Sequence, residues 1–194
     1  MNIIANSCVG GYIYKNELKT NYANPFIWAL VDFDSMFHMI THFNTINFGA
    51  FTIKQDSKDT YSIIIDNAIT VRYIHYKYDK TVHGVKTCGI NVFSDKIWVY
   101  VINKYVSRVR RMIFDNENPV FVFANWFDPP ETTLSYAQLK QLNELNRDNI
   151  ICAVDELIPE FSNIRQVLRE KTRKIYNVGL AKTVYNVITN RSIS

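Results

Sequence analysis

A cysteine near the start of the chain is the residue best placed to do chemistry. Cys8 follows a short apolar run, Ile3-Ile4-Ala5, and precedes Gly10 and Gly11 in a segment that can turn into a helix. A thiol between a strand end and a helix start lies near free backbone N–H groups and the positive end of the helix dipole, which stabilise a thiolate. The spacing predicts a cysteine nucleophile. The alternative is a small buried thiol in a tight strand-to-helix turn.

A base and an orienting group would complete such a site. His75 ends an expected strand, and Asn125 and Asp128 follow an apolar run, so these residues can supply the histidine and the polar group of a Cys–His–Asn/Asp arrangement. A histidine satisfied within the core, and an asparagine that only caps its loop, are the alternatives. Substrate contacts, including N–H groups for a developing oxyanion, are expected from the residues that flank the cysteine: Asn6, Gly10 and Gly11.

Three arginines lie close together near the end of an expected helix. Arg108, Arg110 and Arg111 can bind an anionic sugar, a phosphate or an acyl carrier, because a guanidinium pairs with such groups bidentately. We expect Arg108 and Arg111 to contact substrate. The alternative is a solvated helix end whose cations face the negative pole of the dipole.

The composition indicates one globular domain over residues 1–194. The hydrophobic share is 47% and the charged share 21%, which excludes a disordered chain. The three cysteines form no CxxC pair and the four histidines no HExxH pattern, so neither a disulfide framework, a metal site nor a cofactor is expected. His38 and His42 have the spacing of a metal pair on a helix, but no acidic partner accompanies them.

The net charge of +4 is concentrated in a basic C-terminal segment, where seven basic residues after Phe161 oppose Glu170 alone. This segment is expected to be helical and could face a membrane surface or an anionic substrate, or be only a solvated face. A nucleic-acid partner is not favoured, because no recognition motif is present. Without a signal peptide or a long apolar run, the expected location is cytoplasmic, at the inner membrane face if the basic segment binds there.

Periodicity and turn residues predict alternating elements. The expected strands are 2–6, 50–54, 61–65, 69–75, 119–124 and 149–154, and the expected helices are 12–18, 25–43, 94–114 and 135–145, followed by a helical region after Pro159 broken near Gly179. Asp66-Asn67 forms a hairpin turn, and Ser135 to Gln138 is a capping-box pattern. The alternation predicts an α/β fold, a three-layer sandwich with a mixed, partly parallel sheet.

Several segments of the chain form a recognisable set: Asn6 to Gly11 with Tyr14, Asn24-Pro25-Phe26, His75-Tyr76, Trp98 to Met112, and Phe121 to Asn125 with Asp128. Together they resemble a bacterial family of unknown function found with exopolysaccharide and capsule biosynthesis. The N-terminal Cys, the Pro-Phe-x-Trp block from Pro25 to Trp28 and a later His also resemble a second, related pattern, that of papain-like cysteine peptidases of unknown function.

The resemblance implies an enzyme of surface-polysaccharide biosynthesis that uses the Cys8 thiolate for acyl or related group transfer, or for hydrolysis, on a glycan or an acyl-donor small molecule. The alternative is a non-catalytic binding or scaffold component of a polysaccharide assembly system. An exposed Cys8 in a cleft, within reach of His75, would favour the enzyme. A buried Cys8 beside a flat surface would favour the binding component.

Overall fold

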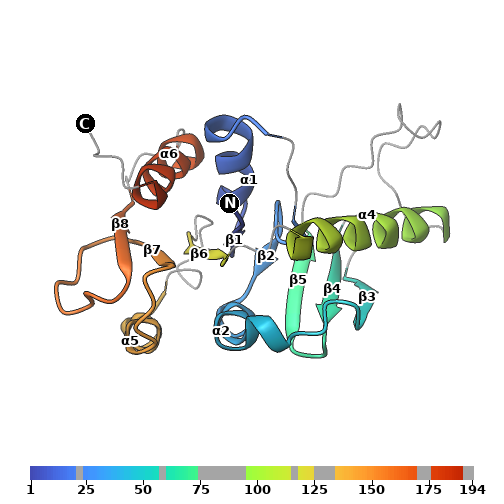
Figure 1. Cartoon of the computed structure of the whole chain (residues 1–194), viewed down its shortest axis with the longest axis horizontal. Coiled ribbons are helices and arrows are strands. Elements are labelled where there is room, and N and C mark those ends of the chain that lie inside the picture. The colour runs from blue at the N-terminus through green and yellow to red at the C-terminus, as the bar shows by residue number, and fades with distance from the viewer. Residues whose placement is uncertain are drawn as a thin grey trace.

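Two four-stranded sheets form the framework of the computed structural model, which describes residues 1–20, 24–56, 60–73, 95–114, 118–124, 134–169 and 176–189 (Figure 1). Sheet A is parallel, in the order β1 (Ile3–Ala5), β6 (Val120–Phe123), β7 (Ile150–Val154) and β8 (Arg165–Leu168). Sheet B is antiparallel, in the order β2 (Leu30–Val31), β5 (Ile69–Tyr73), β4 (Tyr61–Ile65) and β3 (Phe51–Gln55).

Helices cover both faces of sheet A. On one face lie α1 (Val9–Tyr12), the π-helix η1 (Ile13–Glu17) and α6 (Tyr176–Ile188), and on the other lie α2 (Phe33–His42) and α5 (Tyr136–Glu144) (Figure 1). The short 3₁₀ helix η2 (Phe43–Thr45) extends α2, and α4 (Asp95–Phe114) runs across sheet B. The α/β class predicted from the sequence is therefore confirmed.

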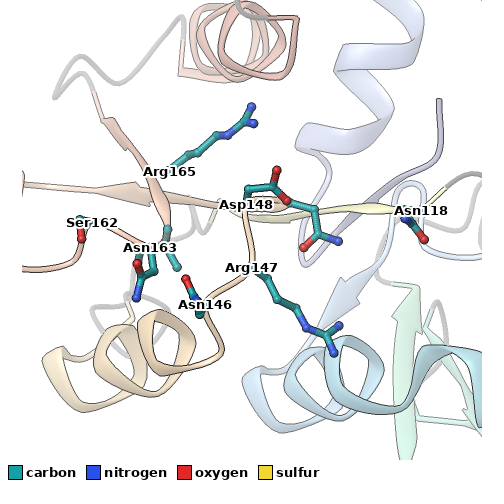
Figure 2. Close-up of a pocket in the computed structure, with 9 residues that line it drawn as sticks. Asn118, Asn146, Arg147, Asp148, Ser162, Asn163 and Arg165 are labelled. Carbon is teal, nitrogen blue, oxygen red and sulfur yellow. The ribbon is translucent and has the colours of Figure 1, made fainter.

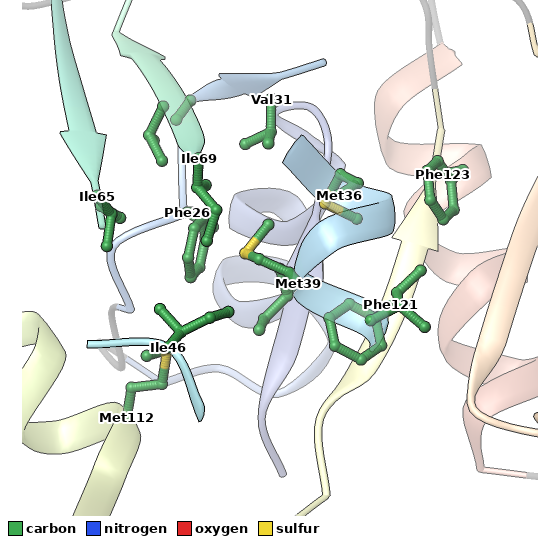
Figure 3. Close-up of a cluster of buried hydrophobic side chains, with 14 of the residues drawn as sticks. Phe26, Val31, Met36, Met39, Ile46, Ile65, Ile69, Met112, Phe121 and Phe123 are labelled. Carbon is green, nitrogen blue, oxygen red and sulfur yellow. The ribbon is translucent and has the colours of Figure 1, made fainter. Parts of the chain in front are cut away.

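Alternation along the strands of sheet A produces two separate cores. Ile3, Val122 and Ile151 belong to the cluster beneath α1 and α6. Their neighbours Ile4 and Phe121 belong to the larger cluster, which also holds the methionines of α2 and isoleucines of sheet B (Figure 3). Because both faces are buried, these strands read as continuous apolar runs rather than as half-polar ones.

The two sheets meet at β1 and β2. The Asn6 carbonyl, which directly follows β1, accepts a hydrogen bond of 3.1 Å from the Val31 N–H. β2 has only two residues because Pro25–Trp28 form a turn before it and Asp32 starts α2 directly after it, with Asp32 Oδ1 accepting from the Ser35 N–H at 2.8 Å. The parallel and antiparallel strands thus occupy two adjoining sheets rather than one mixed sheet, since β2 is too short to extend the ladder.

The predicted helix over 25–43 is wrong in its first part. Residues 25–28 form a turn, and Trp28 has a φ of 62°, in the left-handed region that helices exclude. The apolar spacing that predicted a longer helix comes from core residues on a turn, a strand and a helix in succession, Phe26 and Ile40 among them.

The predicted helical C-terminal segment is also wrong in its first part, because residues 165–168 form β8 beside β7. The run Arg-Gln-Val-Leu is short and carries one deeply buried side chain, Val167, so its periodicity was too brief to show a strand. α6 continues through Gly179 without a break. No described helix has both the length and the apolar character needed to cross a membrane.

The connection from β7 to β8 contains no helix. Instead, the side chain of Gln166 holds it: its Nε2 donates to the carbonyls of Ile158 at 2.8 Å and Phe161 at 2.9 Å, and its Oε1 accepts from the Ile158 N–H at 2.8 Å. Asn163 is tied in turn to Asn143 at the end of α5.

The hairpin turn and the capping box are confirmed. Asp66 and Asn67 have φ values of 51° and 54°, as a tight hairpin between β4 and β5 requires. Ser135 caps α5, its Oγ accepting from the Gln138 N–H while the Gln138 side chain accepts from the Ser135 N–H. The helix expected over 12–18 begins earlier than predicted, at Val9, and continues as the π-helix to Glu17.

Gly10 and Gly11 allow α1 to pack closely on its neighbours. A Cβ at Gly10 would lie 3.1 Å from the Ala5 Cβ, and a Cβ at Gly11 would lie 2.4 Å from the Trp28 indole. The Trp28 ring also contacts Tyr12 edge to face, with centroids 5.0 Å apart. The two glycines are therefore explained by packing.

We predict that Gly11→Ala destabilises the fold by about 1–3 kcal/mol, because the added methyl overlaps the indole of Trp28. Gly10→Ala, whose contact is less severe, should cost less. Urea unfolding of both variants measures this difference. The double variant with Trp28→Leu should recover most of the loss, and a Gly11→Ala protein as stable as the wild type would contradict the packing.

Candidate functional site

The segment Asn6–Cys8 follows β1 at the carboxyl edge of sheet A, where α/β proteins bind ligands. Asn6 is 3% exposed, and its Oδ1 accepts from the Ala124 N–H at 2.8 Å. The Ser7 hydroxyl donates to the Ala124 carbonyl. Both side chains thus bind the end of β6, so the polar groups beside the cysteine hold the two strand ends together.

Cys8 is buried, with 3% of its surface exposed. Burial raises the pKa of the Cys8 thiol from its ordinary value of 9.0, and a backbone hydrogen bond that acts in the opposite direction does not compensate. The lowered thiol pKa expected from a helix start is therefore wrong. The reason is that α1 has only four residues, while desolvation of a thiolate is large.

The predicted partners of Cys8 lie outside the described residues. His75, Asn125 and Asp128 all fall in ranges 74–94 and 125–133, so the Cys–His–Asn/Asp arrangement remains a prediction. Ala124, the last described residue of its segment, is held against Asn6 and Ser7.

The remaining strand ends of this edge carry an ion pair. Asp155 follows β7 and Arg169 follows β8, and Arg169 Nη2 lies 2.6 Å from Asp155 Oδ1. Arg169 belongs to the basic segment expected to face a membrane or an anionic substrate. Its guanidinium is instead engaged by this carboxylate, with 17% of its side chain exposed.

The two arginines expected to bind substrate lie in different surroundings. Arg108 hydrogen-bonds to the hydroxyl of Tyr73, which in turn donates to the Pro25 carbonyl. Burial raises the pKa of Tyr73 to about 12 in spite of the charge of Arg108. Arg111 is exposed and bonds back to Ser107 on its own helix, with Nε 3.3 Å from the Ser107 carbonyl. Arg108 thus joins α4 to the turn before β2. Arg111 instead bonds within α4, one turn back along the helix.

Lys104 is a perturbed residue that the sequence analysis missed. Burial, followed by the charge of Arg108, lowers the pKa of Lys104 to about 8. Its Nζ lies 5.6 Å from the centre of the Tyr100 ring. The available signal was the i,i+4 spacing of Lys104 and Arg108, which places two cations on one side of a helix that packs on a sheet.

A second edge of sheet A carries a polar hollow, which we call the amino-edge groove. It lies where β6, β7 and β8 begin and has a volume of about 620 Å³ (Figure 2). Its lining residues come from three loops: Asn118, Asn146, Arg147, Asp148, Asn149, Ser162, Asn163, Ile164 and Arg165. The run 146–149 contains only polar residues, which was the signal for this groove, but none of these residues was among the predicted site residues.

The described residues contain no group of three or more His, Cys, Asp or Glu side chains that could hold a metal ion. His38 and His42 stack on one another with ring centroids 4.5 Å apart. Their i,i+4 spacing thus produces a ring contact on the surface of α2.

No protein-family model matches this chain, and no curated protein or solved structure matches it either. The likeness to the exopolysaccharide-associated family therefore remains a prediction from the residues quoted above.

For Cys8 we predict slow alkylation whose rate is still rising where an ordinary thiol has reached its plateau, because burial opposes thiolate formation. Iodoacetamide labelling of the folded protein across pH, with peptide mapping to separate the cysteines, measures this. Cys152 is the internal control, since burial raises its pKa to about 12. An apparent pKa of Cys8 below about 8 would restore the activated thiol.

For Lys104 we predict titration near pH 8 in the folded protein. The free energy of unfolding should rise with pH between 8 and the unfolded value of about 10.4, because the unfolded chain then binds the additional proton. Isotope-labelled methylation of the lysines followed by NMR measures the pKa. Arg108→Gln should raise the pKa of Lys104, because it removes a neighbouring positive charge. Arg110→Gln removes an equal charge from an exposed position and should leave the pKa unchanged. Titration of Lys104 at pH 10 or above would contradict its burial.

Proposed function

We propose that this protein is a saccharide-binding component of bacterial surface-polysaccharide biosynthesis. The observation that carries the proposal is the amino-edge groove, whose volume of about 620 Å³ falls in the usual range for small-molecule sites. The link to polysaccharide comes from the family resemblance of the sequence.

The lining of the groove suits a ligand rich in hydroxyl groups. Asparagine amides offer both donors and acceptors, as sugar hydroxyls require. The side chains of Asn118 and Asn146 make no hydrogen bond to any described residue, so their amides remain open to a ligand. None of the described residues that line the groove is aromatic, so they offer no stacking surface for a nucleobase.

The burial of Cys8 supports binding rather than catalysis as the first proposal. A nucleophile must reach its substrate as a thiolate, and the Cys8 thiol is both enclosed and of raised pKa. The asparagine, serine and glycines around it have packing or hydrogen-bonding roles that need no ligand.

The cysteine enzyme is the second proposal, favoured by the position of Cys8 at the carboxyl edge of a parallel sheet. In that case Cys8 would attack an acyl donor, His75 would accept the thiol proton, and Asn125 or Asp128 would orient the imidazole. Asn6, Gly10, Gly11 and Arg108 would contact the substrate.

A cytoplasmic location with contact to the inner membrane face is part of the proposal. Arg165 donates to the Val187 carbonyl at 3.1 Å, and Arg169 pairs with Asp155. Arg169 is thus already paired with a carboxylate, whereas Arg165 is held through one donor and has no charge partner among the described residues.

To test the proposal, neutral and acidic saccharide fragments are titrated into the isotope-labelled protein and followed by NMR. We expect shifts at the amides of Asn118, Asn149 and Asn163, and an affinity that Cys8→Ser changes by less than about twofold, since Cys8 lies on the other edge. Incubation with acetyl-coenzyme A should add no acetyl mass. If no fragment binds, the saccharide proposal fails, and an acetyl adduct that Cys8→Ser abolishes would favour the enzyme.

A further inference from the structure

We infer that the amino-edge groove selects acidic saccharides, those that carry carboxylates on their sugar rings. This inference rests on the proposed function, because it assigns the ligand class of the same groove. It is carried by the two arginines that flank the groove, Arg147 and Arg165.

Each of the two guanidinium groups is held by one hydrogen bond to a backbone carbonyl. Arg147 Nη1 donates to the Ile40 carbonyl of α2 at 2.5 Å, and Arg165 Nη1 donates to the Val187 carbonyl of α6 at 3.1 Å. The other N–H groups of each guanidinium make no hydrogen bond to a described residue. An anchored guanidinium with spare donors binds carboxylate at a low cost in side-chain entropy.

The charges of the groove do not cancel internally. Asp148 lies between the two arginines, which point away from it toward opposite helices (Figure 2). No carboxylate of the described residues lies within 4.0 Å of either guanidinium, in contrast to Arg169 with its partner Asp155. Among the described residues that line it, the groove therefore has one carboxylate, two guanidinium groups without a charge partner and a net positive charge.

The same charges favour a carboxylate sugar over a polyphosphate. Asp148 repels a dense anion placed against the middle of the groove, whereas a saccharide presents separate carboxylates that can reach the two flanks. Between them, sugar hydroxyls meet Asn149 and Asn163. Each of these donates its amide nitrogen to a neighbouring carbonyl, and its side-chain oxygen accepts no hydrogen bond from a described residue.

Digalacturonic acid and galactobiose form a matched pair that differs in the carboxylates. We expect the acid to bind at least about tenfold more tightly by calorimetry, and to lose affinity with added salt while galactobiose does not. Arg147→Gln and Arg165→Gln should each weaken the acid by about fivefold to tenfold and leave galactobiose unchanged. Arg110→Gln, an exposed arginine on α4, is the control of equal charge.

Asp148→Asn provides a test that does not depend on losing an interaction. Its carboxylate makes no hydrogen bond or ion pair with a described residue, and its removal should tighten binding of the acid about twofold to threefold through lost repulsion. Thermal unfolding of each variant shows whether it is folded.

The outcomes separate the two proposals. If the groove binds digalacturonic acid and galactobiose with equal affinity, the selectivity is overturned and saccharide binding still stands. The same holds if neither the two arginine variants nor Asp148→Asn changes the affinity for the acid. Binding of neither sugar overturns both. Shifts confined to the residues around Cys8 and Arg169 place the ligand on the carboxyl edge and also overturn the inference.

Discussion

The junction at Asn6 is the constraint on which the rest of the structure depends. Its N–H donates to the Val122 carbonyl at 3.0 Å, its carbonyl accepts from Val31 at 3.1 Å, and its side-chain oxygen accepts from Ala124 at 2.8 Å. One buried residue thus joins β1 to β6 within sheet A and to β2 of sheet B. A buried amide is stable only when its polar atoms are paired, so the identity of this residue and the meeting of the sheets depend on one another.

This junction changes how the N-terminal segment is understood. A cysteine, a serine, an asparagine and two glycines in one turn have the composition of a catalytic loop, and the serine, the asparagine and both glycines also have a structural role here. Tyr14 extends the pattern, since its hydroxyl accepts from the Ile3 N–H at 2.8 Å and donates to the Met1 carbonyl at 3.0 Å. The segment secures the first strand at both ends.

Elements with a local signal could be predicted from the sequence. The strand 61–65, the apolar strands near Phe121 and Ile151 and the capping box at Ser135 depend on residues within a few positions of one another. β2 and β8 could not be predicted, because two and four residues have too little periodicity and their pairing is decided by partners distant in the chain.

The candidate site was predictable only in part for the same reason. The sequence placed Asn6 and Cys8 between the end of the first strand and the start of a helix, but the burial that raises the pKa of the Cys8 thiol depends on tertiary packing. The lowered pKa of Lys104 likewise depends on how deeply α4 packs on sheet B. The amino-edge groove is made by three loops whose approach depends on the neighbouring order of β6, β7 and β8.

The Gln166 side chain has a consequence for how the amino-edge groove would work. Its amide nitrogen and its amide oxygen both hydrogen-bond to the connection between β7 and β8. They thereby fix a stretch of chain that contains no helix. The wall formed by Ser162, Asn163 and Ile164 is therefore shaped before any ligand arrives. A wall of this kind loses little conformational entropy on binding. Little of the binding free energy of a small, weakly interacting molecule is therefore lost in ordering the protein.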